Sequence, residues 1–222
     1  LQDAIIESSN TFFFSLAYQT EIEDLREHLS YFGFGKNICK DCFMPDIGLL
    51  PSPEWKMNKH NFGWYKGDTV NMGVGQGYIN ATPLQLAYYS AFLATKGRLN
   101  NFSFVQDSKD HKKDTFISEN INLNDWAKIH ESMVGVIENP KGTAGRLRAL
   151  KDYIVAAKSG TVELVSTETK EDYQIIREIE GQRDHAIIIA FGPMPNPEYA
   201  VSVVIENGES GGSVAGPVAI AV

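Results

Sequence analysis

The sequence predicts an α/β protein of the α+β type, in which helices cover an antiparallel sheet. Helical patterns occur in the first 35 residues, at about 82–96 and at about 124–139. From residue 153 onward short apolar runs of strand length replace it. Two of these runs, 185–191 and 199–205, are separated by a proline-rich turn at 193–197, which is typical of an antiparallel hairpin.

The size and charge of the chain limit its function. It has 222 residues, 43% of them hydrophobic, and can therefore bury one sizeable core. Its 28 acidic and 20 basic side chains give a net charge of -8, which argues against binding nucleic acid through the phosphates. No apolar stretch approaches the roughly 18 to 20 residues that a membrane-spanning helix needs.

The first third of the chain predicts two helices and a long irregular segment. Residues 11–18 form the first helix, and the 8–10 segment lies at its entrance or in a tight turn. A second helix begins with the capping-box pattern Thr20-x-x-Glu23 and stops at Gly33. Between residues 33 and 80 the periodicity dissolves into Gly, Pro, Asn and aromatic residues, so we expect a long, functional loop there.

The middle of the chain predicts two more helices before the strands. Thr82, Pro83 and Gln85 combine an N-cap, a proline at the first helical position and a capping-box glutamine, so a helix should run to about residue 96. Residues 100–120 are polar and predict a surface excursion. A further amphipathic helix begins near residue 124 and breaks at 139–140, and the first strand is expected at 153–157.

Two short motifs contain candidate substrate-binding or catalytic residues. Lys158-Ser159-Gly160-Thr161 follows the 153–157 run, and a cation, a hydroxyl and a glycine on a strand form an edge that can bind a carboxylate. Taken alone, the motif also fits a strand that leads into a turn. The second motif is the 8–10 segment, Ser-Ser-Asn, which taken alone also fits an ordinary helix cap.

Together and in this order, the two motifs resemble the second and third signature motifs of penicillin-binding proteins. Further blocks in family order extend the resemblance over nearly the whole chain, and they are Tyr31-Phe32-Gly33-Phe34-Gly35, Gly67-Asp68-Thr69, Gly73-Val74-Gly75-Gln76-Gly77-Tyr78, Ala81-Thr82-Pro83-Leu84-Gln85 and Gly142-Thr143-Ala144. The chain is therefore similar to the transpeptidase domain of class B penicillin-binding proteins. The approach to the hairpin, Arg183-Asp184-His185, is most similar to that of penicillin-binding protein 2, the elongation enzyme of rod-shaped bacteria.

The resemblance implies a fold and an activity. The fold is that of penicillin-binding proteins and serine β-lactamases, and the activity is peptidoglycan D,D-transpeptidation through an acyl-serine intermediate that β-lactams trap. Peptidoglycan stem peptides and β-lactam antibiotics are the implied ligands, an elongation-complex glycosyltransferase is an implied partner, and neither a metal nor an organic cofactor is implied. The implied location is the periplasmic face of the bacterial inner membrane, with the anchor in a segment outside this chain.

The resemblance also assigns roles to individual residues. Ser8 should line the catalytic cleft and take part in a proton relay, and Asn10 should hydrogen-bond the substrate amide. Lys158 and Ser159 should hold the substrate carboxylate and support protonation of the leaving amine. Gly160 should let the substrate dock like a neighbouring strand.

The last assigned role belongs to an oxyanion hole, for which the backbone N–H of Thr161 should be one donor and that of the nucleophile the other. The nucleophile itself lies in the family's S-x-x-K motif, and no Ser in this chain has Lys three positions later. The chain also starts without Met and ends without a helix stop signal. We therefore expect residues 1–222 to be the C-terminal part of a transpeptidase domain that lacks the upstream S-x-x-K segment.

Two alternatives remain open for the function. The same superfamily includes β-lactam sensor domains and serine β-lactamases. Rapid deacylation of the full-length protein would favour this alternative over a transpeptidase. From a different class, the chain could be a non-catalytic interaction module whose ligand is an assembly partner. A degenerate S-x-x-K motif upstream would favour that alternative.

Four further features have structural explanations. For an exported protein, the pair Cys39 and Cys42 favours a local disulfide over free thiols, while a zinc site would need two more ligands, for which His28 and His60 are positional candidates. The glycines of the 73–77 block lack the spacing of a dinucleotide site and instead suit a tight backbone path. His185 is expected to be a hydrogen-bonded structural residue. The aromatic side chains expected in a helix-sheet core are Phe12, Phe13, Phe14, Tyr88, Tyr89 and Phe92.

Overall fold

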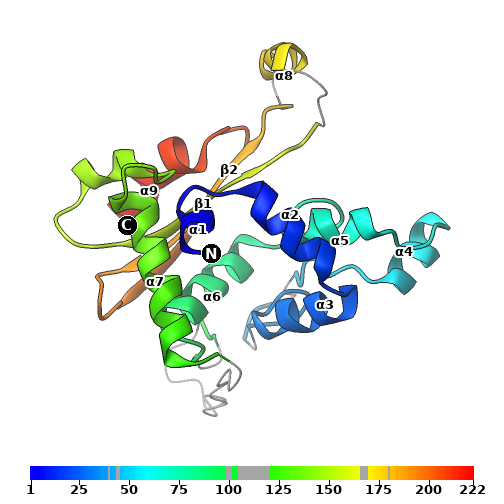
Figure 1. Ribbon diagram of the computed structural model, residues 1–222, viewed down its shortest axis with the longest axis horizontal. Coiled ribbons are helices and arrows are strands. Elements are labelled where there is room, and N and C mark those ends of the chain that lie inside the picture. Colours follow the sequence, from blue (N-terminus) through cyan, green and yellow to red (C-terminus); the bar gives the residue numbers. More distant parts are fainter. Residues whose placement is uncertain (40, 44–45, 99–101, 105–120, 166–169, 180) are drawn as a thin grey trace. The chain divides into compact units, whose positions relative to one another are not determined.

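The computed structural model describes residues 1–39, 41–43, 46–98, 102–104, 121–165, 170–179 and 181–222 (Figure 1). The chain divides into two compact units. The first unit combines Leu1–Ser8 with Asn120–Val222, and the second unit is Ser9–Glu119. Within the described residues, no helix combines the length and the apolar character that crossing a membrane requires.

The first unit contains the sheet. Its elements are α1 (Gln2–Ile6), α7 (Leu123–Glu138), the 3-10 helix η1 (Gly145–Leu150), β1 (Ala156–Val162), α8 (Lys170–Arg177), β2 (His185–Gly192), β3 (Tyr199–Ile205), the π-helical turn η2 (Gly211–Ala215) and α9 (Gly216–Ala221). The three strands form an antiparallel sheet in the order β1-β2-β3. The antiparallel pairing of β2 with β3 confirms the predicted hairpin. In the described sheet β1 is therefore an edge strand.

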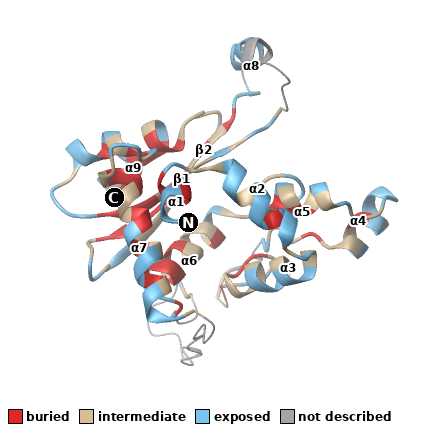
Figure 2. Cartoon of the chain, in the orientation of Figure 1, coloured by how far each residue is buried: buried red, intermediate tan, exposed pale blue. Residues whose placement is uncertain are grey.

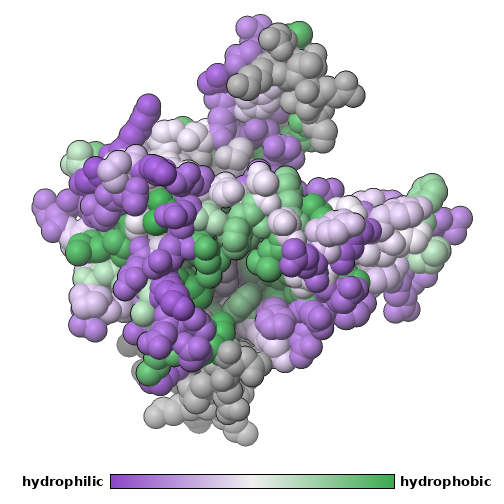
Figure 3. Space-filling model, in the orientation of Figure 1, coloured by the Kyte–Doolittle hydropathy of each residue, from purple (hydrophilic) through white to green (hydrophobic). Residues whose placement is uncertain are grey.

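Helices cover this sheet, and the buried core lies between them and the strands (Figure 2). The core side chains come from α7, η1, η2, α9 and the strands, and they include Val136, Ile137, Ala144, Leu147, Ala157, Ile188, Ala190, Ala215 and Ala219. The amphipathic pattern predicted for this helix is confirmed, because Trp126, Met133 and Ile137 are buried and Ile129 is partly buried. Its outward side chains, such as Lys128 and Glu131, are exposed. Figure 3 shows largely hydrophilic surface over this helix.

One prediction about the strand region is wrong, and one element of it was missed. The first strand begins at Ala156 rather than at residue 153, and it continues through the K-S-G-T motif to Val162. The hydrogen-bond ladder with β2 extends across these polar residues, whereas an apolar run ends where polar side chains begin. The helix α8, between β1 and β2, is also absent from the sequence prediction.

The second unit is helical. Its elements are α2 (Asn10–Gln19), α3 (Ile22–Tyr31), α4 (Pro53–His60), α5 (Lys66–Gly73) and α6 (Pro83–Ala94). The capping box predicted for α6 is confirmed, because the Thr82 hydroxyl accepts from the Gln85 N–H and the Gln85 side chain accepts from the Thr82 N–H. The excursion predicted at 100–120 lies almost wholly outside the described residues.

Three predictions for the second unit need correction. The residue that caps α3 is Glu21, and the Thr20 hydroxyl donates instead to the Leu16 carbonyl, so the capping box at Thr20 is wrong. The 33–80 segment is not irregular throughout, because α4 and α5 lie within it, each started by a local cap. The predicted aromatic core is wrong in part. Phe92 is fully buried but packs against Phe32 in this helical unit, and Phe12 is 38% exposed.

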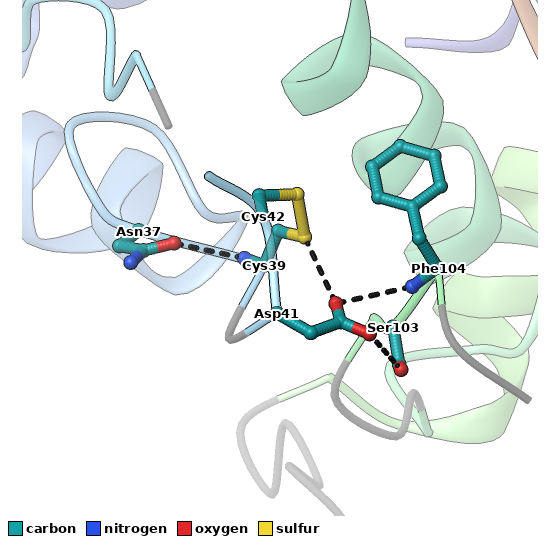
Figure 4. Close-up of a disulfide and its surroundings, with 6 residues drawn as sticks. All are labelled: Asn37, Cys39, Asp41, Cys42, Ser103 and Phe104. Carbon is teal, nitrogen blue, oxygen red and sulfur yellow. Dashed lines mark hydrogen bonds between the residues drawn. A yellow bond between two sulfur atoms is a disulfide. The ribbon is translucent and has the colours of Figure 1, made fainter. Parts of the chain in front are cut away.

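The predicted disulfide between Cys39 and Cys42 is confirmed (Figure 4). Within the same turn, Asp41 accepts hydrogen bonds from the Ser103 hydroxyl at 2.5 Å and from the Phe104 N–H at 3.1 Å. The disulfide turn therefore holds together two parts of the chain that are about sixty residues apart. Because both sulfurs are in the disulfide, neither is available as a zinc thiolate.

The glycine block of the second unit has the structural role expected of it. A Cβ on Gly73 would lie 2.4 Å from the Cβ of Ala17, so the glycine permits α5 to approach α2 closely. Gly75 and Gly77 both have positive φ, a conformation that side chains disfavour. The block therefore shapes the backbone between α5 and α6.

Candidate active site

The site of the first unit begins at a turn that follows α1. Ser8 has a φ of 55°, which is unusual for a residue with a side chain, and its N–H donates to the Ile5 carbonyl. The position of α1 depends on α7, where a Cβ on Gly135 would lie 2.7 Å from the Cδ1 of Ile6. The glycine therefore allows α1 to pack close to α7, and the turn at Ser8 follows from that packing.

Lys158 reaches this turn from β1. Its Nζ donates to the Ser8 Oγ at 2.8 Å and to the Ser159 carbonyl at 2.7 Å. The first contact joins residues 150 positions apart in the chain. Since α7 packs against both α1 and β1, this one helix supports both partners of the hydrogen bond.

The environment of Lys158 changes its protonation. Burial lowers the pKa of its ammonium group to about 8, because the charged form loses solvation. The hydrogen-bond partners described for its Nζ are neutral oxygens, not carboxylates. The group is therefore a cation at neutral pH that gives up its proton more readily than an exposed lysine does.

Ser159 carries the next polar side chain of the site. Its Oγ lies 2.7 Å from the Oγ1 of Thr143, which belongs to the loop between α7 and η1. Thr143 also lines a cavity of about 360 Å³, together with Gly142, Ala144, Gly145, Arg146, Ser210, Gly212 and Ser213. The hydroxyl pair thus connects β1 with the lining of this cavity.

Gly160 and Thr161 continue the strand. A Cβ on Gly160 would make only ordinary contacts with the described part of the chain, the nearest at 3.7 Å from the Ile187 Cβ, so local packing does not require glycine there. Thr161 is exposed, and its hydroxyl donates to the Glu209 carbonyl at 3.3 Å. The carboxylate of Glu209 in turn pairs with Arg177 of α8.

The structure therefore brings some of the predicted site residues together. Ser8, Lys158, Ser159, Gly160 and Thr161 all lie in the first unit, and the first three are connected through Lys158. Asn10 is the first residue of α2 and belongs to the second unit. The neighbouring Ser9 has a different role, because its hydroxyl caps α2 by accepting from the Phe12 N–H. The serine that accepts from Lys158 is Ser8.

The arrangement suits the binding of an anion and the transfer of a proton. A partly desolvated ammonium beside hydroxyl groups can hold a carboxylate with charge-assisted hydrogen bonds. The chain from Lys158 to Ser8 can also deliver a proton to a neighbouring group. In the described residues, one group of His, Cys, Asp and Glu side chains is compact enough for a metal, Cys39, Asp41 and Cys42, and the disulfide involves two of them.

One other predicted residue has a clear position, and one contact was missed. His185 begins β2, and its Nδ1 accepts from the Asn207 N–H at 3.0 Å, which confirms its structural role. Sequence reasoning assigned no role to Thr143. The only signal was its place in the Gly142-Thr143-Ala144 block, since a contact with Ser159 depends on the path of the loop after α7.

Comparison with known proteins places this geometry in context. The family described as penicillin binding protein transpeptidase domain matches residues 1–222. Peptidoglycan D,D-transpeptidase MrdA of Escherichia coli strain K12 is 34% identical over 215 residues, which cover 94% of this chain and 34% of that protein. The chain thus spans about a third of the length of this curated relative.

Solved structures give the same result. The crystal structure of Pseudomonas aeruginosa PBP2 in complex with WCK 5153 matches with a TM-score of 0.83 and 34% identity, over 98% of this chain and 47% of that one. The complex between PBP2 and MreC from Helicobacter pylori matches with a TM-score of 0.82 and 29% identity, over 99% of this chain and 38% of that one. These matches confirm the predicted fold.

Proposed function

Because the chain belongs to the penicillin-binding protein transpeptidase domain family, we propose that it supplies the substrate-binding wall of a peptidoglycan D,D-transpeptidase. The observation that carries this proposal is the hydrogen bond from Lys158, on the K-S-G strand, to Ser8. The donor stem peptide lies along the β1 edge, where Lys158 and Ser159 bind its terminal carboxylate. Asn10 binds an amide of the same peptide.

The proposed reaction has two steps. A serine outside residues 1–222, in an S-x-x-K segment, attacks the carbonyl before the terminal D-Ala, forms an ester and releases D-Ala as an amine. An amine of a neighbouring stem peptide then attacks the ester and regenerates the serine. In the first step the nucleophilic serine gives its proton to the lysine of the S-x-x-K segment, and Lys158 passes a proton through Ser8 to the leaving nitrogen. The Thr161 N–H stabilises the oxyanion together with the N–H of the nucleophile.

Gly160 has a specific role in this proposal. The packing of the described residues does not require a glycine at this position. The missing side chain therefore leaves room for a peptide beside β1. The edge position of β1 in the described sheet supports the same binding mode, in which the donor peptide aligns like an additional strand. β-Lactams occupy this position as mimics of the donor and leave a stable acyl-serine.

The setting of the reaction is also part of the proposal. The relatives' names support a place in peptidoglycan synthesis. From the family we infer a location on the periplasmic face of the inner membrane, with the anchor in a segment outside residues 1–222. The complex of Helicobacter pylori PBP2 with MreC supports an assembly role for proteins of this type. An elongation-complex glycosyltransferase is the further partner that we infer from the family.

The test is acylation of the protein that contains this chain together with its S-x-x-K segment. Intact mass after incubation with a labelled penicillin should show one stable adduct. Lys158→Ala should slow acylation on the order of 100-fold, because the variant loses both the carboxylate contact and the proton donor. Lys128→Ala is the matched control, since Lys128 pairs with Asp125 on the surface of α7.

Each contrary result has a definite meaning. Unchanged acylation of Lys158→Ala would show that the site assignment is wrong. Rapid loss of the adduct would favour a serine β-lactamase or a sensor domain over a transpeptidase. Absence of any adduct on the wild-type protein would favour the non-catalytic interaction module.

A further inference from the structure

The contact between Thr143 and Ser159 has a consequence for the carboxylate site. Both partners are hydroxyl groups, and their oxygens are 2.7 Å apart, a normal distance for an O–H···O hydrogen bond. Either oxygen can be the donor in the free protein. The direction of this hydrogen bond decides whether the Ser159 hydrogen is available to a ligand.

The backbone holds Thr143 firmly in place. The Gly142 N–H donates to the Asn139 carbonyl and the Ala144 N–H donates to the Val136 carbonyl, so both neighbours of Thr143 are tied to the end of α7. On the other side, a Cβ on Gly212 would lie 2.4 Å from the Thr143 carbonyl oxygen. The hydroxyl of Thr143 is therefore presented to Ser159 by a loop that has little freedom to shift.

A bound carboxylate determines the direction of the hydrogen bond. An ionised carboxylate only accepts hydrogen bonds, so Ser159 must use its single hydrogen to bind it. The Ser159 oxygen must then accept from Thr143, which makes the order Thr143 to Ser159 to carboxylate. Hydrogen bonds in such a chain polarise one another, which strengthens the contact with the ligand.

We propose that Thr143 is a positioning residue of the carboxylate site, which orients the Ser159 hydroxyl as a donor toward the substrate. This inference rests on the proposed function. The charges near Thr143 agree with an anionic ligand, because Arg146 is the only charged side chain among the described residues that line the cavity. No acidic side chain of that lining opposes a carboxylate.

The test measures acylation kinetics of the same full protein with a labelled penicillin over a range of concentrations. Thr143→Val keeps the shape but removes the donor, and we expect a second-order acylation rate about tenfold lower, mostly through a weaker initial complex. Thr143→Ser should retain the wild-type rate. Thr95→Val is the matched control, because the Thr95 hydroxyl donates to a helix carbonyl, that of Ala91, in the second unit.

A double substitution separates positioning from general damage. In a Ser159→Ala background, Thr143→Val should have no further effect on acylation, since the group that it orients is absent. An equal, additive loss in that background would show a merely structural role and would overturn the inference. Wild-type rates for Thr143→Val would overturn it as well. If the wild-type protein forms no adduct, the proposed function fails first, and the inference fails with it.

Discussion

At the scale of single residues, the two groups that meet at the site are both in costly states. Lys158 is buried enough that its pKa falls to about 8, and Ser8 holds a backbone conformation that a side chain disfavours. Such costs are typical of residues kept for function rather than for stability. The cost at Lys158 can be measured directly, because it depends on pH.

The pH dependence has a definite sign. Since the folded pKa of Lys158 lies below the unfolded value of 10.5, the unfolded chain binds more protons between pH 8 and 10.5, and the contribution of this residue to stability rises with pH. We expect the free energy of unfolding of the wild type, relative to Lys158→Met, to increase on the order of 3 kcal/mol across this range. Denaturant unfolding at several pH values measures this difference. A flat difference would show that Lys158 is not desolvated.

At the scale of elements, the edge strand β1 depends on a close approach by η2. An ideal Cβ on Gly211 would lie 2.1 Å from the Ile187 carbonyl oxygen and 2.6 Å from that of Gly160. Both obstacles are backbone atoms of paired strands, which cannot move aside cheaply. The first residue of η2 thus contacts the backbone of the K-S-G motif.

Gly211→Ala should therefore disturb both the fold and the site. We expect the free energy of unfolding to fall by about 2 to 3 kcal/mol, because the added methyl group overpacks a buried contact. Gly67→Ala is the matched control, since a Cβ at this position in α5 meets no atom of the described residues within 4 Å, and it should be neutral or slightly stabilising. Thermal or urea unfolding of the two variants distinguishes them. Equal stabilities would mean that η2 does not pack against β1 in this way.

The elements show what sequence patterns can and cannot predict. The helix α6 and the β2–β3 hairpin were predictable, because a capping box and a proline-rich turn encode them locally. The helices α4 and α5 were not. Both have eight residues, too few for a clear helical period, although Ser52 and Pro53 mark the start of α4. A buried ion pair between Lys56 and Asp68, with 2.6 Å between Nζ and Oδ2, joins the two helices, and no local pattern reveals it.

The candidate site also has a part that the sequence predicts and a part that it does not. The family resemblance was enough to assign Ser8 and Lys158 to one catalytic cleft, and their side chains are hydrogen-bonded although they are 150 positions apart. The approach of Thr143 to Ser159 could not be predicted, because it depends on where the loop after α7 returns to the sheet. Contacts between hydroxyl groups leave no periodic or compositional signal in a sequence.

At the scale of the whole molecule, a covalent crosslink supplements the packing. The Cys39–Cys42 disulfide closes a very short loop, but Asp41 within that loop also holds Ser103 and Phe104. Loss of the crosslink would therefore loosen a junction between distant parts of the second unit. A disulfide of this kind also agrees with the proposed export of the protein.

Replacement of both cysteines by alanine should lower the free energy of unfolding by roughly 2 kcal/mol, the value expected when so short a loop is released. Urea unfolding with and without a reductant measures the effect. The reductant should destabilise the wild type and leave Cys39→Ala/Cys42→Ala unchanged. If the wild type is equally stable under both conditions, the crosslink contributes nothing to the fold.

The division into two units also determines when the site can form during synthesis. The second unit, Ser9–Glu119, is continuous in sequence, so all of its residues are synthesised before α7 and the sheet. The first unit is interrupted, because α1 must wait for α7, and Ser8 must wait for β1, which is made about 150 residues later. The sequence of the helical unit is therefore complete well before the chain holds both groups of the candidate carboxylate site. That site can be completed only after β1 has been made and paired with β2.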